Sequence, residues 1–270
     1  MDRTLFSPPM IETFRVCRRA YQFAFGADQV DKISMSALCK RFILRALTEV
    51  HRGRLNSLPE AQKFLGQHWP TDKFAEGDLD HQEKAVQAFR FVYRVLTHYV
   101  SFPYRPRGSE VAGVALKVRA RVPHLKVYLE ETMDLILWHP ERATLEIVDF
   151  HLHPLKPLDP AWPSASLLVR YFLAERLRTR WQFKKVLFTF CHLQTAGVTP
   201  VTIELDDALF RVHWPEMLKT LEQMKSPENY EPHRSAACKR CSFLSECKAM
   251  DAAADATAGD TTASPAARTA

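Results

Sequence analysis

The first hundred residues repeat apolar positions at the three- and four-residue spacing that places side chains on one face of a helix. Phe14, Tyr21 and Phe25 follow this spacing after Ser7 and two prolines, a combination that typically starts a helix. The N-terminal third of the chain is therefore expected to be helical. The pattern predicts four helices, over 7–26, 36–52, 59–69 and 79–100.

From residue 110 onward the spacing changes to the two-residue alternation of strands. In VAGVALKVRARV the apolar residues fall on one side of an extended chain, and Lys117, Arg119 and Arg121 fall on the other. Two more strands follow, joined by the polar turn HPERA, and predict an antiparallel meander. The expected strands are 110–122, 128–138, 144–151, 183–192 and 199–205, with further helices over 164–180 and 206–224.

The strand around EIVDFHLHP carries the candidate chemistry. Five alternate positions would project from one face of this strand: Leu145, Ile147, Asp149, His151 and His153. An apolar base that ends in a carboxylate and two imidazoles is typical of the floor of a functional site. We therefore expect metal binding or catalysis at this strand.

Composition limits the class of protein. With 270 residues, 46% of them hydrophobic, the chain can bury a sizeable core. A formal net charge of +6 permits an anionic partner such as nucleic acid without requiring one. The N-terminus lacks a secretory signal pattern, and no apolar run is long enough to span a bilayer. A soluble, cytoplasmic protein with no membrane association is expected.

The six cysteines divide into two groups. Cys238-x2-Cys241-x5-Cys247 has the spacing of metal ligands, and thiolates select zinc or an iron–sulfur cluster, both of which usually take four ligands. Cys17 lies beside two arginines that favour its thiolate form, so it is the candidate fourth ligand. The remaining two fall in apolar patterns and are expected to be buried: Cys39 and Cys191. The alternative is a set of unrelated thiols.

With these cysteines and a carboxylate-bearing strand, the chain resembles the PD-(D/E)xK nuclease superfamily, and within it the RecB/AddB-type iron–sulfur exonucleases and the CRISPR-associated exonucleases. The resemblance covers about 7–248. It implies an α/β fold with a restriction-endonuclease-like mixed sheet flanked by helices. It also implies a [4Fe–4S] cluster that clasps the two ends of the domain together, with four ligands: Cys17, Cys238, Cys241 and Cys247.

The same resemblance assigns the catalytic residues. The family carries an Asp at the end of one strand and Asp/Glu-x-Lys on the next, and Asp134 in ETMDLIL and Asp149 in IVDFH match the two acids. His151 stands where the family has lysine, and Leu167 stands where it has glutamine. The family's early helical histidine finds no match in SALCKRFILRALTEV (36–50). The active-site motif is therefore degraded.

Two aspartates on adjacent strands can hold Mg²⁺ or Mn²⁺ through oxygen ligands, and such a cation activates water and neutralises charge on a phosphate. A histidine is mostly neutral at pH 7 and replaces a lysine charge only in part, but His151 could act as a general base or bind metal itself. Arg170 and Tyr171 lie on the helix expected to cover this site. Basic residues that could contact phosphates, or simply form solvated surfaces, are Lys117, Arg119, Arg121, Arg176, Arg178 and Arg180.

The residues and the family resemblance support three alternative hypotheses for the function. The leading one is a metal-dependent, exonuclease-like deoxyribonuclease that acts on DNA. The second is a catalytically inactive DNA-binding or scaffold subunit of a repair or defence complex, and the third is a zinc-stabilised module with no nucleic-acid role. The chain has no P-loop motif G-x-x-x-x-G-K-[ST], so unwinding of DNA would need a helicase partner.

The domain prediction is one nuclease-like domain over 1–250. It consists of a helical part (1–105), a sheet core (106–235) and a cysteine-rich clasp (236–250). The tail, 251–270, is rich in Ala, Thr and Asp and is expected to be disordered.

Overall fold

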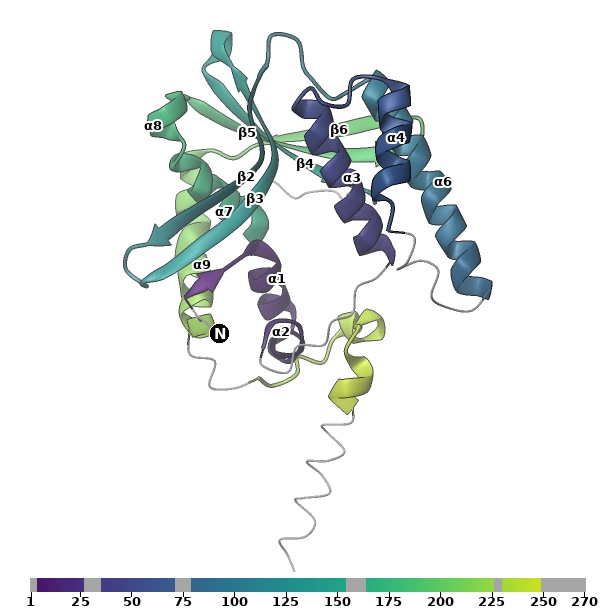
Figure 1. Ribbon diagram of the computed structural model, residues 1–270. Coiled ribbons are helices and arrows are strands. Elements are labelled where there is room, and N and C mark those ends of the chain that lie inside the picture. Colours follow the sequence, from purple (N-terminus) through teal and green to yellow (C-terminus); the bar gives the residue numbers. More distant parts are fainter. Residues whose placement is uncertain (1–3, 27–34, 71–78, 154–163, 226–229, 249–270) are drawn as a thin grey trace, which may run out of the picture.

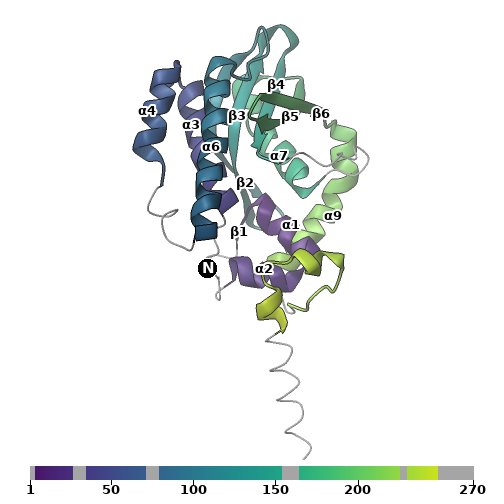
Figure 2. The ribbon, with the colours of Figure 1, turned by 90° about the vertical axis from the view of Figure 1, so that its right-hand side faces the viewer.

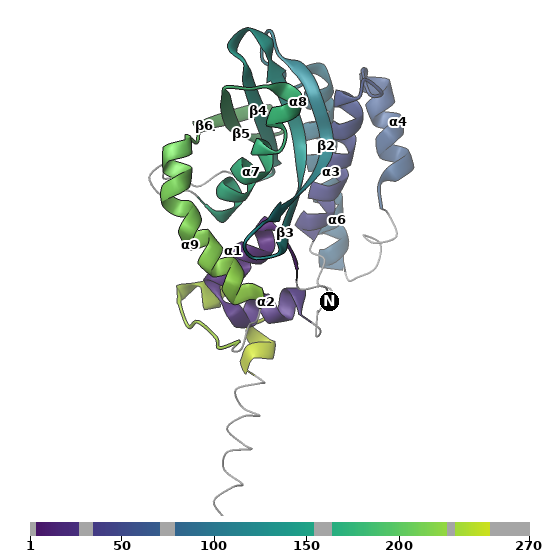
Figure 3. The same ribbon diagram turned by 90° about the vertical axis from the view of Figure 1, so that its left-hand side faces the viewer.

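A six-stranded mixed sheet lies between two layers of helices in the computed structural model (Figure 1, Figure 2 and Figure 3). The structure describes residues 4–26, 35–70, 79–153, 164–225 and 230–248. The predicted α/β class is confirmed, and a mixed sheet flanked by helices is consistent with a restriction-endonuclease-like fold. Within these residues no helix is long and apolar enough to cross a membrane. The tail predicted to be disordered lies outside the described residues.

The strand order is β1-β3-β4-β5-β6, with β2 paired to β3. The predicted antiparallel meander of β2, β3 and β4 is confirmed. A crossover through α7 (Ala165–Glu175) then makes β4 and β5 parallel, which gives the sheet its mixed character. The strands are β1 (Leu5–Phe6), β2 (Glu110–Val122), β3 (Val127–His139), β4 (Thr144–His151), β5 (Lys185–Gln194) and β6 (Gly197–Glu204). The pattern did not predict β1, which adds in parallel to β3.

One face of the sheet is covered by three of the predicted N-terminal helices. They are α3 (Met35–His51), α4 (Leu58–His68) and α6 (Leu79–Ser101). Ser57 caps α4 by accepting a hydrogen bond from the Glu60 N–H, and Pro59 lies in the first turn. Apolar side chains of these helices pack against alternate residues of the strands, including Leu135, Val148 and Phe150. This face is therefore a separate hydrophobic cluster from the one on the other side of the sheet.

The opposite face is covered by α1 (Pro8–Val16), α7 and α9 (Asp207–Lys225). Ser164 caps α7 by accepting from the Leu167 N–H, and Glu12 of α1 accepts from the Ser166 N–H at 3.2 Å. These contacts fix the start of α7 against α1. The prediction of one helix over 164–180 is wrong: α7 ends at Glu175, and a short α8 (Arg178–Trp181) follows after a tight turn.

The prediction of one helix over 7–26 is also wrong, because Cys17 interrupts it. Cys17 is extended, with φ −161° and ψ 118°, and separates α1 (Pro8–Val16) from α2 (Arg18–Phe25). The break redirects α2 so that the Phe23 ring packs 5.7 Å from Phe243 in the C-terminal segment. That segment contains the 3₁₀ helix η2 (Ala236–Arg240). The two ends of the described chain therefore meet beneath the sheet (Figure 1).

Candidate active site and cysteine cavity

Asp134 and Asp149 lie where two neighbouring strands separate. The ladder between β3 and β4 ends at the pair Leu135 and Val148; Asp134 immediately precedes Leu135, and Asp149 immediately follows Val148. Phe150 lies beyond the ladder, and its N–H donates to Asp134 Oδ2 at 3.0 Å. The separating strands thus place the two carboxyl groups side by side, as their sequence positions suggested.

Asp134 holds a proton at neutral pH. Burial, which contributes most, the negative charge of Asp149 and a hydrogen bond to that carboxylate together raise its pKa from 3.8 to about 8. Asp134 in its protonated form can donate to Asp149 while its other oxygen accepts from Phe150. The two acids therefore behave as a pair that shares one proton.

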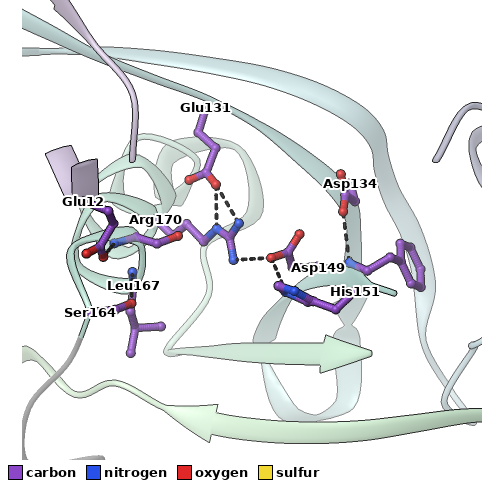
Figure 4. A network of polar contacts seen from close by, with 10 residues as sticks. Glu12, Glu131, Asp134, Asp149, His151, Ser164, Leu167 and Arg170 are labelled. Carbon is purple, nitrogen blue, oxygen red and sulfur yellow. Dashed lines mark hydrogen bonds and ion pairs between the residues drawn. The ribbon is translucent and has the colours of Figure 1, made fainter. Parts of the chain in front are cut away.

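Asp149 remains ionised because cations surround it. Burial acts to raise its pKa, but the Arg170 guanidinium and the hydrogen bond from His151 hold the pKa well below its usual range. Arg170 Nη1 lies 3.0 Å from Asp149 Oδ2, and His151 Nε2 lies 2.7 Å from the same oxygen (Figure 4). Asp149 Oδ2 thus contacts both Arg170 and His151.

Arg170 connects this pair to a third acid, Glu131. Arg170 Nε and Nη2 donate to Glu131 Oε1 at 2.8 and 2.6 Å (Figure 4). The Arg170 side chain is only 10% exposed, so its guanidinium neutralises two buried carboxylates away from water. The other Glu131 oxygen, Oε2, is buried with no hydrogen-bond partner in the described residues, and burial raises the pKa of Glu131.

The sequence indicated one member of this network, Arg170, but not another, Glu131. Arg170 was placed on the covering helix, and it is the single charged residue in the apolar run from Leu167 to Ala174, which indicates a buried partner. Glu131 was missed, because a charged residue on a strand usually faces water. Tyr171, named with Arg170, is buried in the core and its ring lies 4.7 Å from that of Phe210.

A cavity of about 420 Å³ adjoins Asp134 on the α3 face of the sheet. His51 lines it together with Asp134 and Phe150, and the His51 and Phe150 rings stack at 6.2 Å. Burial, with the charge of Arg105, lowers the pKa of His51 to about 4, so its imidazole is neutral and hydrogen-bonds Tyr99 at 2.7 Å. His51 directly follows the segment in which no helical histidine was found. The continuing helical pattern could have revealed it.

His153 does not join the site. β4 ends at His151, so the expectation that His153 shares the strand face is wrong. Its Nε2 instead lies 3.2 Å from Ser36 Oγ on α3. Of the five positions expected on one face, Leu145 and Ile147 lie in the core, and only Asp149 and His151 reach the polar network.

The four candidate cysteine ligands line one cavity of about 1020 Å³. Cys17 comes from the break between α1 and α2, and the other three come from η2 and the residues after it. Arg19 Nη1 lies 3.9 Å from Cys247 Sγ, which brings a cation to the thiol group. Cys39 and Cys191 are buried elsewhere, and burial raises the pKa of both thiols.

Neither location contains a preformed metal site. Among the described residues, no group of three or more His, Cys, Asp or Glu side chains is arranged to hold a metal ion. The donor types nevertheless suit the expected groups: four thiols for an iron–sulfur cluster, and two carboxylates for a divalent cation. Both ligand assignments stay predictions.

No protein-family model and no curated protein matches the chain. Among solved structures, a candidate exonuclease from Eubacterium rectale is similar at 15% identity and a TM-score of 0.48, over 89% of this chain and 88% of that one. The protein SSO0001 is similar at 13% identity and a TM-score of 0.29, over 76% of this chain and 93% of that one. The fold description therefore rests on the sheet order and helix layers given above.

Proposed function

We propose that this protein is a PD-(D/E)xK-type, RecB/AddB-like nuclease that hydrolyses DNA phosphodiester bonds with Mg²⁺ or Mn²⁺. The observation that carries the proposal is the buried, proton-sharing pair of Asp134 and Asp149 at the point where β3 and β4 separate. Carboxyl groups with strongly shifted pKa values beside a cavity are common at functional sites, because burial and neighbouring charges tune the pKa of a group to its chemical task.

Asp134 and Asp149 would hold the cation. When bound, a divalent cation supplies an activated water and neutralises charge that develops on the phosphate. Asp134 must lose its proton before its carboxylate can ligate, so binding is expected to strengthen as the pH rises towards 8. His51, neutral and on the wall of the same cavity, is available as a nitrogen ligand or proton acceptor.

His151 would take over part of the missing lysine's role. With Nε2–H donating to Asp149 Oδ2, its Nδ1 carries a lone pair and can accept a proton from the attacking water. In this arrangement Asp149 orients the imidazole, and Arg170 keeps Asp149 ionised. His151 is thus proposed as the general base.

A nuclease assay tests this proposal. Labelled single- and double-stranded DNA is incubated with Mg²⁺ or Mn²⁺ and wild type, Asp149→Asn, or the exposed control Asp207→Asn. Cleavage should disappear in Asp149→Asn and persist in the control, and His151→Lys should raise the rate in Mg²⁺. Equal background degradation by wild type and Asp149→Asn would refute the proposed nuclease activity.

We also propose that Cys17, Cys238, Cys241 and Cys247 hold a [4Fe–4S] cluster. Support comes from the shared cavity, to which the two ends of the domain contribute, and from the guanidinium beside Cys247. Protein purified anaerobically should be brown with absorption near about 400 nm, and Cys17→Ser should lose the colour. Cys39→Ser, a buried thiol outside the cavity, is the control. A colourless protein that contains one equivalent of zinc would refute the proposed iron–sulfur cluster.

A second candidate function is a catalytically inactive DNA-binding or scaffold subunit of a repair or defence complex, with a partner protein such as a helicase. The guanidinium of Arg170 favours it, because it already neutralises Asp149 and reduces the attraction of that carboxylate for a metal ion. This function predicts DNA binding without cleavage in either metal. The same assay, combined with a binding measurement, separates the two candidates.

A further inference from the structure

The cations of α3 and of the turn that follows it fall into two groups with different surroundings. Just after the helix ends at His51, Arg52 and Arg54 bind the two oxygens of Glu49, in its last turn, at 3.3 and 3.1 Å. Nearer its start, three cations have no carboxylate within ion-pair distance in the part of the chain that the structure describes: Lys40, Arg41 and Arg45. Positive charges left without internal partners beside a candidate site are suited to an anionic ligand.

One of the three cations, Arg45, lines the same cavity as Asp134, and the other two lie on the same helix. Arg45 is one of the lining residues, with Thr48 and Thr132, and its guanidinium lies 5.8 Å from the Phe64 ring on the helix side. The charge of Lys40 reaches the acids, since it opposes the rise that burial causes in the pKa of Asp134 and of a neighbouring glutamate. Two of the three cations, Lys40 and Arg45, therefore lie close to the proposed reaction centre.

Several of the other basic residues that the sequence singled out contact acids or aromatic rings within the fold. Lys117 pairs with Glu130 at 2.7 Å, and the Arg119 guanidinium lies 4.3 Å from the centre of the Tyr128 ring. Arg178 binds the carboxylate at the end of α7 through two hydrogen bonds. On β2 and after α7, Lys117 and Arg178 are thus neutralised by carboxylates, whereas no ion pair among the described residues neutralises the three cations of α3.

We propose that Lys40, Arg41 and Arg45 bind consecutive phosphates of a nucleic-acid strand and direct it into the cavity above Asp134. Arg45 then supplies, next to the reacting phosphate, the permanent positive charge that His151 does not provide. A guanidinium suits this task because its planar donors match phosphate oxygens and it stays charged at all working pH values. This inference rests on the proposed function, since the ligand is that function's substrate.

The test is a binding measurement without catalysis. Fluorescence anisotropy with a labelled single-stranded DNA oligonucleotide in EDTA, over a series of salt concentrations, compares wild type with Lys40→Ala/Arg41→Ala/Arg45→Ala. The control, Lys185→Ala/Arg211→Ala/Lys219→Ala, removes the same charge from exposed side chains that pair with acids elsewhere. Three lost phosphate contacts should weaken binding at least about tenfold and reduce the salt slope by about 2, at about 0.7 per contact.

The outcomes separate this inference from the proposed function. Equal weakening in the two triple variants, or no binding by wild type, overturns the α3 site. Displacement of the oligonucleotide by AMP at equal phosphate concentration also overturns it, because the cations would then serve a mononucleotide. Wild type that binds in EDTA through α3 but does not cleave in Mn²⁺ refutes the nuclease and supports the α3 site. Retention of most binding by Arg45→Lys further supports a phosphate contact.

Discussion

Replacing Asp134 by asparagine should remove a pH dependence of stability that the wild type shows above neutrality. In the folded protein the Asp134 pKa is raised from 3.8 to about 8, so the folded state binds more protons than the unfolded state between these values. The free energy of unfolding then falls as the pH rises through this window. Asparagine resembles the protonated acid, and its oxygen can still accept from the Phe150 N–H.

The contribution of Asp134 to the free energy of unfolding can be measured separately above pH 6.5. Below that value His51 acts in the opposite direction, because burial lowers its pKa from 6.5 to about 4 and the folded state binds fewer protons there. Asp149, whose pKa is lowered, contributes its slope only below its unfolded value of 3.8. Between pH 6.5 and 9 the Asp134 contribution amounts to about 2 kcal/mol, at about 1.4 kcal/mol per pH unit until the group titrates near pH 8.

Urea unfolding in EDTA at several pH values from 6.5 to 9 measures this difference. Wild type should lose about 2 kcal/mol relative to Asp134→Asn across the range, and groups common to both proteins cancel in the comparison. Asp207→Asn, which removes an exposed carboxylate from α9, should follow the wild type. Parallel profiles for wild type and Asp134→Asn would show that the acid pair does not share a proton.

Three further substitutions have expected effects on urea unfolding at pH 7. Arg170→Met leaves two buried carboxylates without their guanidinium and should cost about 3–5 kcal/mol; a loss below about 1 kcal/mol contradicts the buried ion pair. Phe150→Ala, 2% exposed in wild type, should cost about 3–5 kcal/mol, whereas Phe102→Ala, 69% exposed, should change stability little. Tyr104→Phe removes the hydroxyl that donates to buried Glu146 at 2.8 Å and should cost about 1–3 kcal/mol, with an unchanged midpoint as the contrary result.

Periodicity predicted most of the elements but not their interruptions. The three-strand meander and helices such as α3 and α4 lie where the spacing of apolar residues placed them. The break at Cys17 left no trace in the pattern, because Phe14 and Tyr21 keep helical spacing across it and their rings still meet at 5.4 Å. The break follows from the packing of α2 against a segment more than two hundred residues away.

Some residues of the candidate site were likewise predicted from the sequence, and others were found only in the structure. Strand alternation singled out Asp149, and the family resemblance added Asp134 on the neighbouring strand, where the structure places it. Glu131 could not be assigned to the site, since the burial of its side chain depends on the helix that supplies Arg170. His51 was missed although the helical pattern of α3 continues to it.

By itself, the sequence predicted most of the helices and strands in their order, and with the family resemblance it named two acids and four cysteines as candidate ligands. Only the tertiary structure decided how the charges balance. β3 and β4 separate just before the two acids, and α7 inserts Arg170 between Asp149 and Glu131. Residue spacing encodes which face a side chain occupies, whereas pKa values and ion pairs depend on burial and on partners brought together by folding.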